Sequence, residues 1–306
     1  MTDTSADVRT ALIPLRGPYD LGEVALMGFG HRDESAFDGV MRLAFCLDGM
    51  AGQVGVEVRQ QDAALELVVH GEGDLAVVTR QVARVVSADA DGDAWAAVCA
   101  ADPVLARVHS VAPGFRPSNF YSPYEAALWA IVSARRPRAQ GILLRRRLAE
   151  AHGRTFTLVG RSESAVPTPH QLLDLDAFAG LPADRIPRLH ALAQAALDGQ
   201  LDVTALTSVE PEVAMRDLQR LPGIGPFYSA LIIIRSLGLT DVLSTQEHTR
   251  EAVREQYGLD HSPSDAELER IAEAWRPFRT WAAVMLRALS PRLRSAPGSG
   301  PGILPR

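Results

Sequence analysis

The 306-residue sequence contains no lysine, so arginine alone supplies its 31 Lys-or-Arg side chains. A guanidinium stays protonated at any working pH and has no free lone pair, so arginine cannot replace a lysine amine as a nucleophile. The absence excludes enzymes that attack a carbon atom with a lysine and pass through a Schiff base. Only the N-terminal amine remains as an amine nucleophile, and we expect it to lie on a flexible segment.

Cysteine is scarce as well, since Cys46 and Cys99 are the only two. Two cysteines exclude a four-cysteine iron–sulfur cluster, and the histidines show no metal-ligand spacing that would complete a zinc site. We expect both cysteines to be buried thiols. The sequence also lacks an apolar run long enough to span a bilayer and a basic-then-apolar start, which predicts a cytoplasmic protein without a membrane segment.

The charge is distributed unevenly along the chain, although its net value is −6. Residues 1–110 hold 17 acidic and 8 basic side chains, whereas the remainder holds 20 acidic and 23 basic ones. A surface that faces nucleic acid is therefore expected in the second half.

Hydrophobic spacing predicts an α+β fold with two folded domains. Residues 1–10 and 295–306 are expected to be disordered. Residues 11–112 are expected to form a small antiparallel sheet with helices, because apolar residues alternate or cluster in short runs at 41–47, 54–58 and 65–69 and then recur at helical spacing from Leu75. Residues 113–294 carry helix start and stop signals throughout, which predicts an all-helical domain.

The stretch Leu221-Pro-Gly-Ile-Gly225 joins two predicted helices, one over 212–220 and one that begins at Pro226 and ends at Gly238. Glycine permits positive φ and close approach of another molecule, and a helix N-terminus offers unpaired N–H groups. Together these features favour an anion such as a nucleic-acid phosphate. The alternative is a plain tight turn without a ligand.

This stretch, followed by an apolar helix, resembles the helix-hairpin-helix of the base-excision DNA glycosylases. The resemblance to one bacterial branch, DNA-3-methyladenine glycosylase II, extends over nearly the whole chain. It includes Phe120-Tyr-Ser-Pro-Tyr-Glu, Pro167-Thr-Pro-His-Gln-Leu, Ala195-Ala-Leu-Asp-Gly199 and Trp275-Arg-Pro-Phe-Arg-Thr-Trp281. It implies a monomeric, monofunctional enzyme that flips an alkylated purine out of double-stranded DNA and hydrolyses its N-glycosidic bond.

The same resemblance implies roles for individual residues. Gly223, Ile224 and Gly225 would hold the DNA backbone, with a metal ion on neighbouring carbonyls as the one candidate cofactor. Arg135 stands where the family inserts a residue into the base stack, and it would contact phosphate or the minor groove together with Arg136. Arg145 to Arg147 would either contact phosphate or form a solvated face. The base pocket would be lined by the residues Phe227, Leu231, His248 and Arg287.

Counting without gaps from the hairpin places the catalytic Asp of the methyladenine branch at Glu247, whereas the endonuclease III branch would place it at Thr245. A carboxylate there stabilises the oxocarbenium charge that develops on the sugar and can activate water. Alternatively, Glu247 is merely an acid favoured in the first turn of a helix. The chain would then be a DNA-binding protein that recognises damaged or abasic DNA without excision.

Overall fold

The computed structural model describes residues 8–27 and 36–295 of the chain, and residues 1–7 and 296–306, both predicted to be disordered, lie outside this part. The described residues group into two compact units. The first unit contains the described parts of Met1–Leu15, Ala25–Asp89 and Ser118–Leu239, and the second those of Arg16–Val24, Ala90–Pro117 and Thr240–Arg306. No helix in the described ranges is long and apolar enough to cross a membrane.

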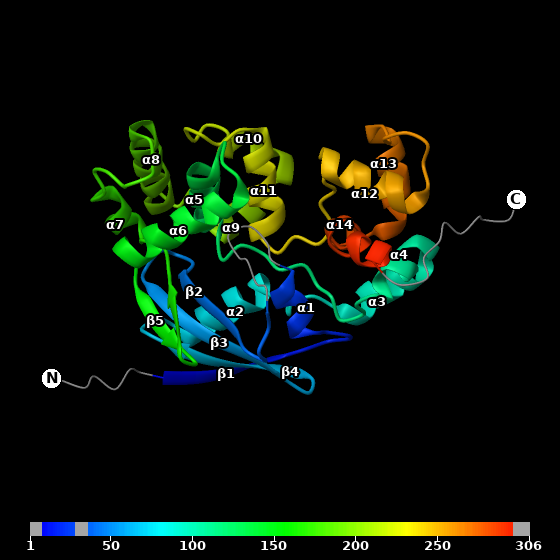
Figure 1. Cartoon of the computed structure of the whole chain (residues 1–306), viewed down its shortest axis with the longest axis horizontal. Coiled ribbons are helices and arrows are strands. Elements are labelled where there is room, and N and C mark those ends of the chain that lie inside the picture. Colours follow the sequence, from blue (N-terminus) through cyan, green and yellow to red (C-terminus); the bar gives the residue numbers. More distant parts are fainter. Residues whose placement is uncertain (1–7, 28–35, 296–306) are drawn as a thin grey trace, which may run out of the picture. The chain divides into compact units, whose positions relative to one another are not determined.

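A four-stranded antiparallel sheet in the first unit has the order β1-β4-β3-β2. Its strands are β1 (Val8–Pro14), β2 (Met41–Cys46), β3 (Gln53–Gln61) and β4 (Ala64–His70). The predicted alternation is confirmed, because Leu65, Leu67 and Val69 on β4 are all fully buried. Helix α2 (Leu75–Val85) packs on this sheet, as its apolar spacing predicts (Figure 1).

Strand β1 corrects the expectation that the chain is disordered as far as residue 10. Val8 pairs with His70 of β4, and the pairing continues to Pro14 opposite Ala64. Most side chains of this strand stay exposed or half-buried, so the strand is held by its backbone hydrogen bonds and has no apolar face to reveal it in the sequence.

The first unit also contains α5 (Pro123–Ser133), every residue of which is buried, together with further helices. They are α6 (Arg138–His152), α7 (Pro169–Leu173), α8 (Ile186–Leu197), α9 (Val203–Thr207), α10 (Pro211–Leu218) and α11 (Pro226–Ser236), with a 3₁₀ turn η1 (Ala183–Arg185) before α8. Helices α6, α8 and α11 all pack against α5. The buried α5 therefore supports the hairpin formed by α10 and α11.

Residues 155–164 depart from the predicted all-helical region, because they form the antiparallel strands β5 (Thr155–Leu158) and β6 (Arg161–Ser164). The two-residue connection, Val159 and Gly160, has positive φ at both positions, which is the geometry of a tight hairpin turn. Phe156 and Leu158 pack beside Ala44 of the large sheet. Four-residue strands carry too few alternating positions to be recognised in the sequence.

A buried ion pair ties the sheet to α5 and α6. Glu125 of α5 is fully buried and accepts a hydrogen bond from Arg145 of α6, with 2.8 Å between Nη2 and Oε2. It also accepts one from the backbone N–H of Cys46 on β2 at 3.0 Å. Arg145 is thus neither a phosphate contact nor part of a solvated face. The sheet and the hairpin helices belong to the same compact unit, and the chain passes from the second unit back into the first between Pro117 and Ser118.

The second unit is helical. It contains α3 (Gly92–Ala101), α4 (Pro103–His109), α12 (Glu247–Tyr257), α13 (Asp265–Ala272), the 3₁₀ turn η2 (Glu273–Trp275) and α14 (Arg279–Ser295), while the short α1 (Leu21–Leu26) begins in this unit. Trp95 contacts Trp281 and Phe278 in its core, at centroid distances of 5.7 and 5.6 Å. Both cysteines are buried as predicted, and burial raises the pKa of each thiol.

Candidate nucleic-acid interface

The loop between α10 and α11 is a tight hairpin anchored in the core by Ile224, which is only 3% exposed. The N–H of Ile224 donates to the carbonyl of Leu221 at 3.0 Å. Gly223 has a φ of 96°, in the region that favours glycine. Gly225 has a φ of −97°, so the expectation of positive φ is wrong there. A Cβ on Gly225 would meet no atom within 4 Å, and the space in front of it is open.

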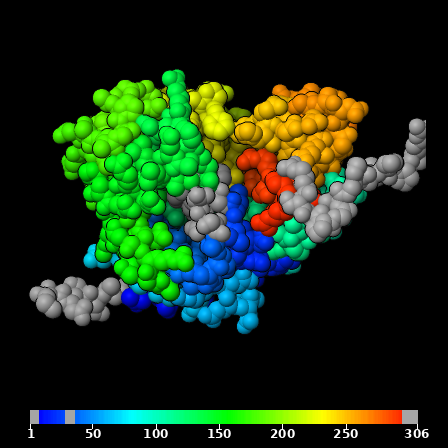
Figure 2. Space-filling model, in the orientation of Figure 1, coloured from blue at the N-terminus to red at the C-terminus, as the bar shows by residue number. Residues whose placement is uncertain are grey.

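The N-terminus of α11 has no side-chain cap. Its first intrahelical hydrogen bond runs from Ser229 N–H to the carbonyl of Gly225 at 2.9 Å. Pro226 has no N–H, and helix geometry leaves the N–H groups of Gly225 and Phe227 without an intrahelical partner. The hairpin is at the surface, where the yellow residues of this segment are visible (Figure 2). An anion would find both open donors and the positive end of the helix dipole here.

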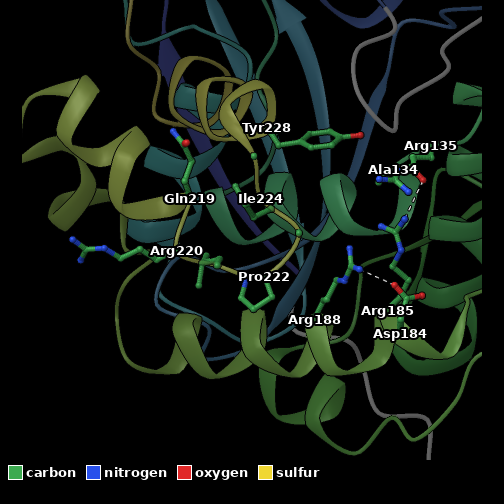
Figure 3. Close-up of a pocket in the computed structure, with 13 residues that line it drawn as sticks. Ala134, Arg135, Asp184, Arg185, Arg188, Gln219, Arg220, Pro222, Ile224 and Tyr228 are labelled. Atoms are coloured by element: carbon green, nitrogen blue, oxygen red, sulfur yellow. Dashed lines mark hydrogen bonds and ion pairs between the residues drawn. The ribbon is translucent and has the colours of Figure 1, made fainter.

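Next to this helix end lies a surface pocket of about 560 Å³, lined by Gly223, Ile224 and Gly225. Four arginines and a single acid also line it (Figure 3); they are Arg135, Arg185, Arg188, Arg220 and Asp184. Arg220 pairs with Asp217, and the other three guanidinium groups against the carboxylate of Asp184 give the pocket a positive potential, which attracts phosphate.

The structure brings Arg135, but not Arg136, to the hairpin pocket. Arg135 is exposed and has a φ of 58°, an uncommon conformation for a residue other than glycine, which places it at the tip of the turn that follows α5. Among the described residues it has no ion-pair partner. Arg136 is half-buried and donates to the carbonyl of Gly180 at 2.8 Å, outside the pocket lining.

Arg185 holds the turn that carries Arg135. Its Nη1 donates to the carbonyl of Ile131 at 2.8 Å, and its Nη2 donates to that of Ala134 at 3.4 Å. These carbonyls lie at the C-terminal end of α5, where a cation is favoured by the helix dipole. Burial, followed by the neighbouring charge of Arg188, lowers the pKa of Arg185. Its guanidinium therefore positions the backbone of the pocket.

Arg188 of α8 pairs with Asp184, with 2.7 Å between Nη2 and Oδ2. The two side chains are 34% and 58% exposed, and a solvated pair of this kind contributes about 0 to 1 kcal/mol. The side chain of Arg188 also lies against the hairpin, since a Cβ on Gly223 would come within 3.2 Å of its Cδ. Little free energy is needed to release Arg188 from Asp184 toward another anion.

Two of the predicted pocket residues lie on α11 in the first unit. Phe227 is 51% exposed, an unusual degree for a large apolar side chain, and its ring contacts that of Tyr228 edge-on at 5.2 Å. Leu231, one turn further on, is half-buried and packs against the core of this unit. Phe227 thus offers an exposed aromatic face beside the open helix end.

The other three predicted residues lie in the second unit. Glu247 is the first residue of α12 and is exposed, as is His248. The N-cap residue Gln246 makes no side-chain capping bond, and Glu247 provides the only acidic group in this first turn. Arg287 of α14 is half-buried, and burial lowers its pKa.

Asp241, the other acid close to the hairpin in sequence, is occupied by two arginines. Arg276 Nη1 and Arg279 Nε donate to its carboxylate at 2.8 and 2.7 Å. The N–H of Arg279 at the start of α14 also donates to it at 3.3 Å. Asp241 consequently stabilises the start of α14, whereas Glu247 has no ion pair among the described residues.

No family model matches the sequence. Two curated relatives are a probable bifunctional transcriptional activator/DNA repair enzyme AlkA of Mycobacterium tuberculosis, 26% identical over 288 residues, and DNA-3-methyladenine glycosylase 2 of Escherichia coli, 29% identical over 183 residues. These alignments cover 91% and 58% of this chain, but only 56% and 61% of the relatives. The chain therefore spans little more than half the length of the curated relatives it matches.

Among solved structures, a 3-methyladenine DNA-glycosylase from Archaeoglobus fulgidus superposes with a TM-score of 0.71 at 19% identity, over 90% of this chain and 97% of that one. The fold is that of a base-excision DNA glycosylase. An 8-oxoguanine glycosylase/lyase from Clostridium acetobutylicum also shares this glycosylase fold, with a TM-score of 0.65 at 16% identity over 91% of this chain and 93% of that one. The resemblance to DNA-3-methyladenine glycosylase II predicted from the sequence is confirmed.

Sequence reasoning missed Arg185 and Arg188, which this glycosylase fold places beside the hairpin. Both lie more than 30 residues before it, at the start of a predicted helix. One signal could have revealed them. Both lie near a helix N-terminus, where a positive charge is unfavourable because of the helix dipole, and basic residues at such a position suggest a role in binding.

Proposed function

We propose that the chain is a monofunctional DNA glycosylase that hydrolyses the N-glycosidic bond of alkylated purines of the 3-methyladenine type in double-stranded DNA. One observation carries the proposal: within a glycosylase fold, the open N-terminus of α11 faces a pocket lined by four arginines. This site is suited to the phosphate backbone of DNA. The names of the curated relatives, which are repair enzymes, support the same conclusion.

In the proposed reaction, the hairpin holds the DNA backbone while the damaged nucleotide leaves the base stack. Phe227 contacts the flipped base with its exposed ring, and Leu231 lies one turn further along the same helix. Glu247 stabilises the oxocarbenium charge on the sugar and activates water. Glu247 makes no ion pair with any residue that the structure describes, in contrast to Asp241, and this supports the assignment. In this proposal the Glu247 carboxylate activates the water, and the reaction uses no cofactor.

The substitution of Glu for the Asp of the family motivates a second candidate function. Glutamate carries one additional methylene, and a displacement of about 1 Å can reduce a rate roughly a hundredfold. A chain that keeps the hairpin and loses the chemistry would bind damaged or abasic DNA without excision.

The decisive experiment combines a release assay with a binding assay. We expect the protein to release free 3-methyladenine from alkylated duplex DNA and to leave alkali-labile sites. Tight binding of an abasic duplex without base release would support the binding protein instead. Failure of both measurements would contradict the proposed function altogether.

A further inference from the structure

Arg188 differs from the other arginines of the hairpin pocket because it lies directly against the glycine turn and has only one exposed partner. Its Nη1 would be 3.5 Å from a Cβ on Gly223, while its Nη2 pairs with Asp184. Arg185 is committed to two backbone carbonyls, and Arg220 pairs with Asp217. Figure 3 shows Arg188 rising from α8 beside the hairpin, with its guanidinium directed to Asp184.

These surroundings do not fit a divalent metal ion at the hairpin carbonyls, where the family resemblance implies a metal site. Asp184, the single carboxylate of the lining, is paired with Arg188. A metal ion would therefore be placed among guanidinium groups of like charge without a free carboxylate to offset the repulsion.

We propose that Arg188 is the cationic partner of a DNA phosphate at the hairpin, and that duplex binding consequently needs no divalent metal ion. The inference rests on the proposed function. The phosphate is held between the N–H groups at the start of α11 and the guanidinium of Arg188. To contact the phosphate, Arg188 gives up its ion pair with Asp184. The planar guanidinium donates two parallel hydrogen bonds to phosphate oxygens, as arginine characteristically does.

The exchange is favoured by the exposure of the existing pair. Asp184 is 58% exposed and is solvated when Arg188 leaves. Phosphate meets additional donors at the glycine turn that Asp184, on η1, does not reach in the structure. Asp184 thereby acts as a competitor that weakens nonproductive binding of anions and holds Arg188 in place when DNA is absent.

Fluorescence anisotropy with an undamaged duplex, titrated at several KCl concentrations, tests the proposal. We expect Arg188→Ala to lower affinity about tenfold at low salt and to reduce the slope of log affinity against log salt by about 0.9, the value for one phosphate contact. Arg188→Lys should keep the slope but bind more weakly than wild type, because a lysine ammonium cannot donate two parallel hydrogen bonds to one phosphate. Asp184→Asn should bind more tightly than wild type.

Arg254→Ala is the matched control. Arg254 is 38% exposed and pairs with Glu251, which is 54% exposed, so the two arginines have nearly equal exposure and equivalent partners. Its loss should change the salt slope much less than the loss of Arg188. Thermal melting of each variant verifies the fold, and wild-type affinity should be the same with and without EDTA at fixed ionic strength.

The outcomes separate this inference from the proposed function. If Arg188→Ala binds like Arg254→Ala, or if EDTA abolishes binding, the role of Arg188 is refuted while base excision can persist. If the wild-type protein binds no duplex at any salt concentration, the proposed function is refuted and this inference with it.

Discussion

Arg188 lies against Gly223 at the centre of the hairpin, so that a Cβ on this glycine would approach Cδ of Arg188 to 3.2 Å. Gly223 also has a φ of 96°, where a side chain is strained. Gly225, two residues later, has neither constraint. The two glycines of one motif therefore serve different purposes, conformation at the first position and open space at the second.

This difference predicts separable effects of alanine at the two positions. Gly223→Ala should reduce the free energy of unfolding by about 1 to 2 kcal/mol, the cost of a left-handed conformation with a Cβ, and should weaken duplex binding. Gly225→Ala should leave the melting temperature close to wild type yet still weaken binding, because its methyl group would occupy the approach of the phosphate. Unchanged affinity of a folded Gly223→Ala/Gly225→Ala protein would remove the hairpin from the DNA surface.

A second prediction concerns the acid. Glu247→Gln should reduce the rate of base excision at least about a hundredfold, the effect of removing one electrostatic stabiliser, while duplex binding stays near wild type. Asp241→Asn should instead lower the melting temperature, because Arg279 loses its carboxylate partner and Arg276 keeps only Glu273, and should retain excision. Single-turnover assays of base release at saturating enzyme compare the excision rates of the two variants. Full activity of Glu247→Gln would transfer the catalytic role to another group.

The absence of lysine predicts the fate of the DNA strand. Excision should proceed by attack of water and should leave an intact abasic strand, because the sequence contains no lysine that could form a Schiff base with the sugar. Borohydride added to the enzyme and a lesion duplex should trap no covalent complex, and strand cleavage should appear only after alkali. Either a trapped adduct or cleavage without alkali would refute the monofunctional assignment.

Arg145 is buried with Glu125 and is not expected to contact DNA, so its replacement should affect the stability of the protein strongly. Arg145→Met should reduce the free energy of unfolding by about 3 to 5 kcal/mol, because it leaves a fully buried carboxylate without its cation. The double variant Glu125→Gln/Arg145→Met should be less damaged than the single one. Urea unfolding measures both, and Arg146→Met, at an exposed neighbouring position, is the control. Equal stability of Arg145→Met and Arg146→Met would show that the buried pair contributes nothing.

Local and compositional features explain why much of the fold could be predicted. The hairpin is recognisable because glycine and proline set the local backbone conformation without a distant partner. Helix α2 is recognisable because Val78, Val82 and Val85 recur at helical spacing. Strand β1 was missed because its stability comes from hydrogen bonds to β4, about 55 residues away in the sequence. A mostly exposed strand leaves no hydrophobic pattern to detect.

The sequence by itself determined the chemistry that this protein lacks and the position of its hairpin, since the absence of lysine and the glycine motif depend on no distant partner. Only the tertiary structure decided what each arginine does. Arg145 and Arg146 are adjacent and chemically identical, yet Arg145 is buried against Glu125 and Arg146 remains exposed. Arg188 likewise gained its place beside Gly223 from the packing of α8. The role of a charged side chain follows from its burial and its partners, and both are set by residues far away in the chain.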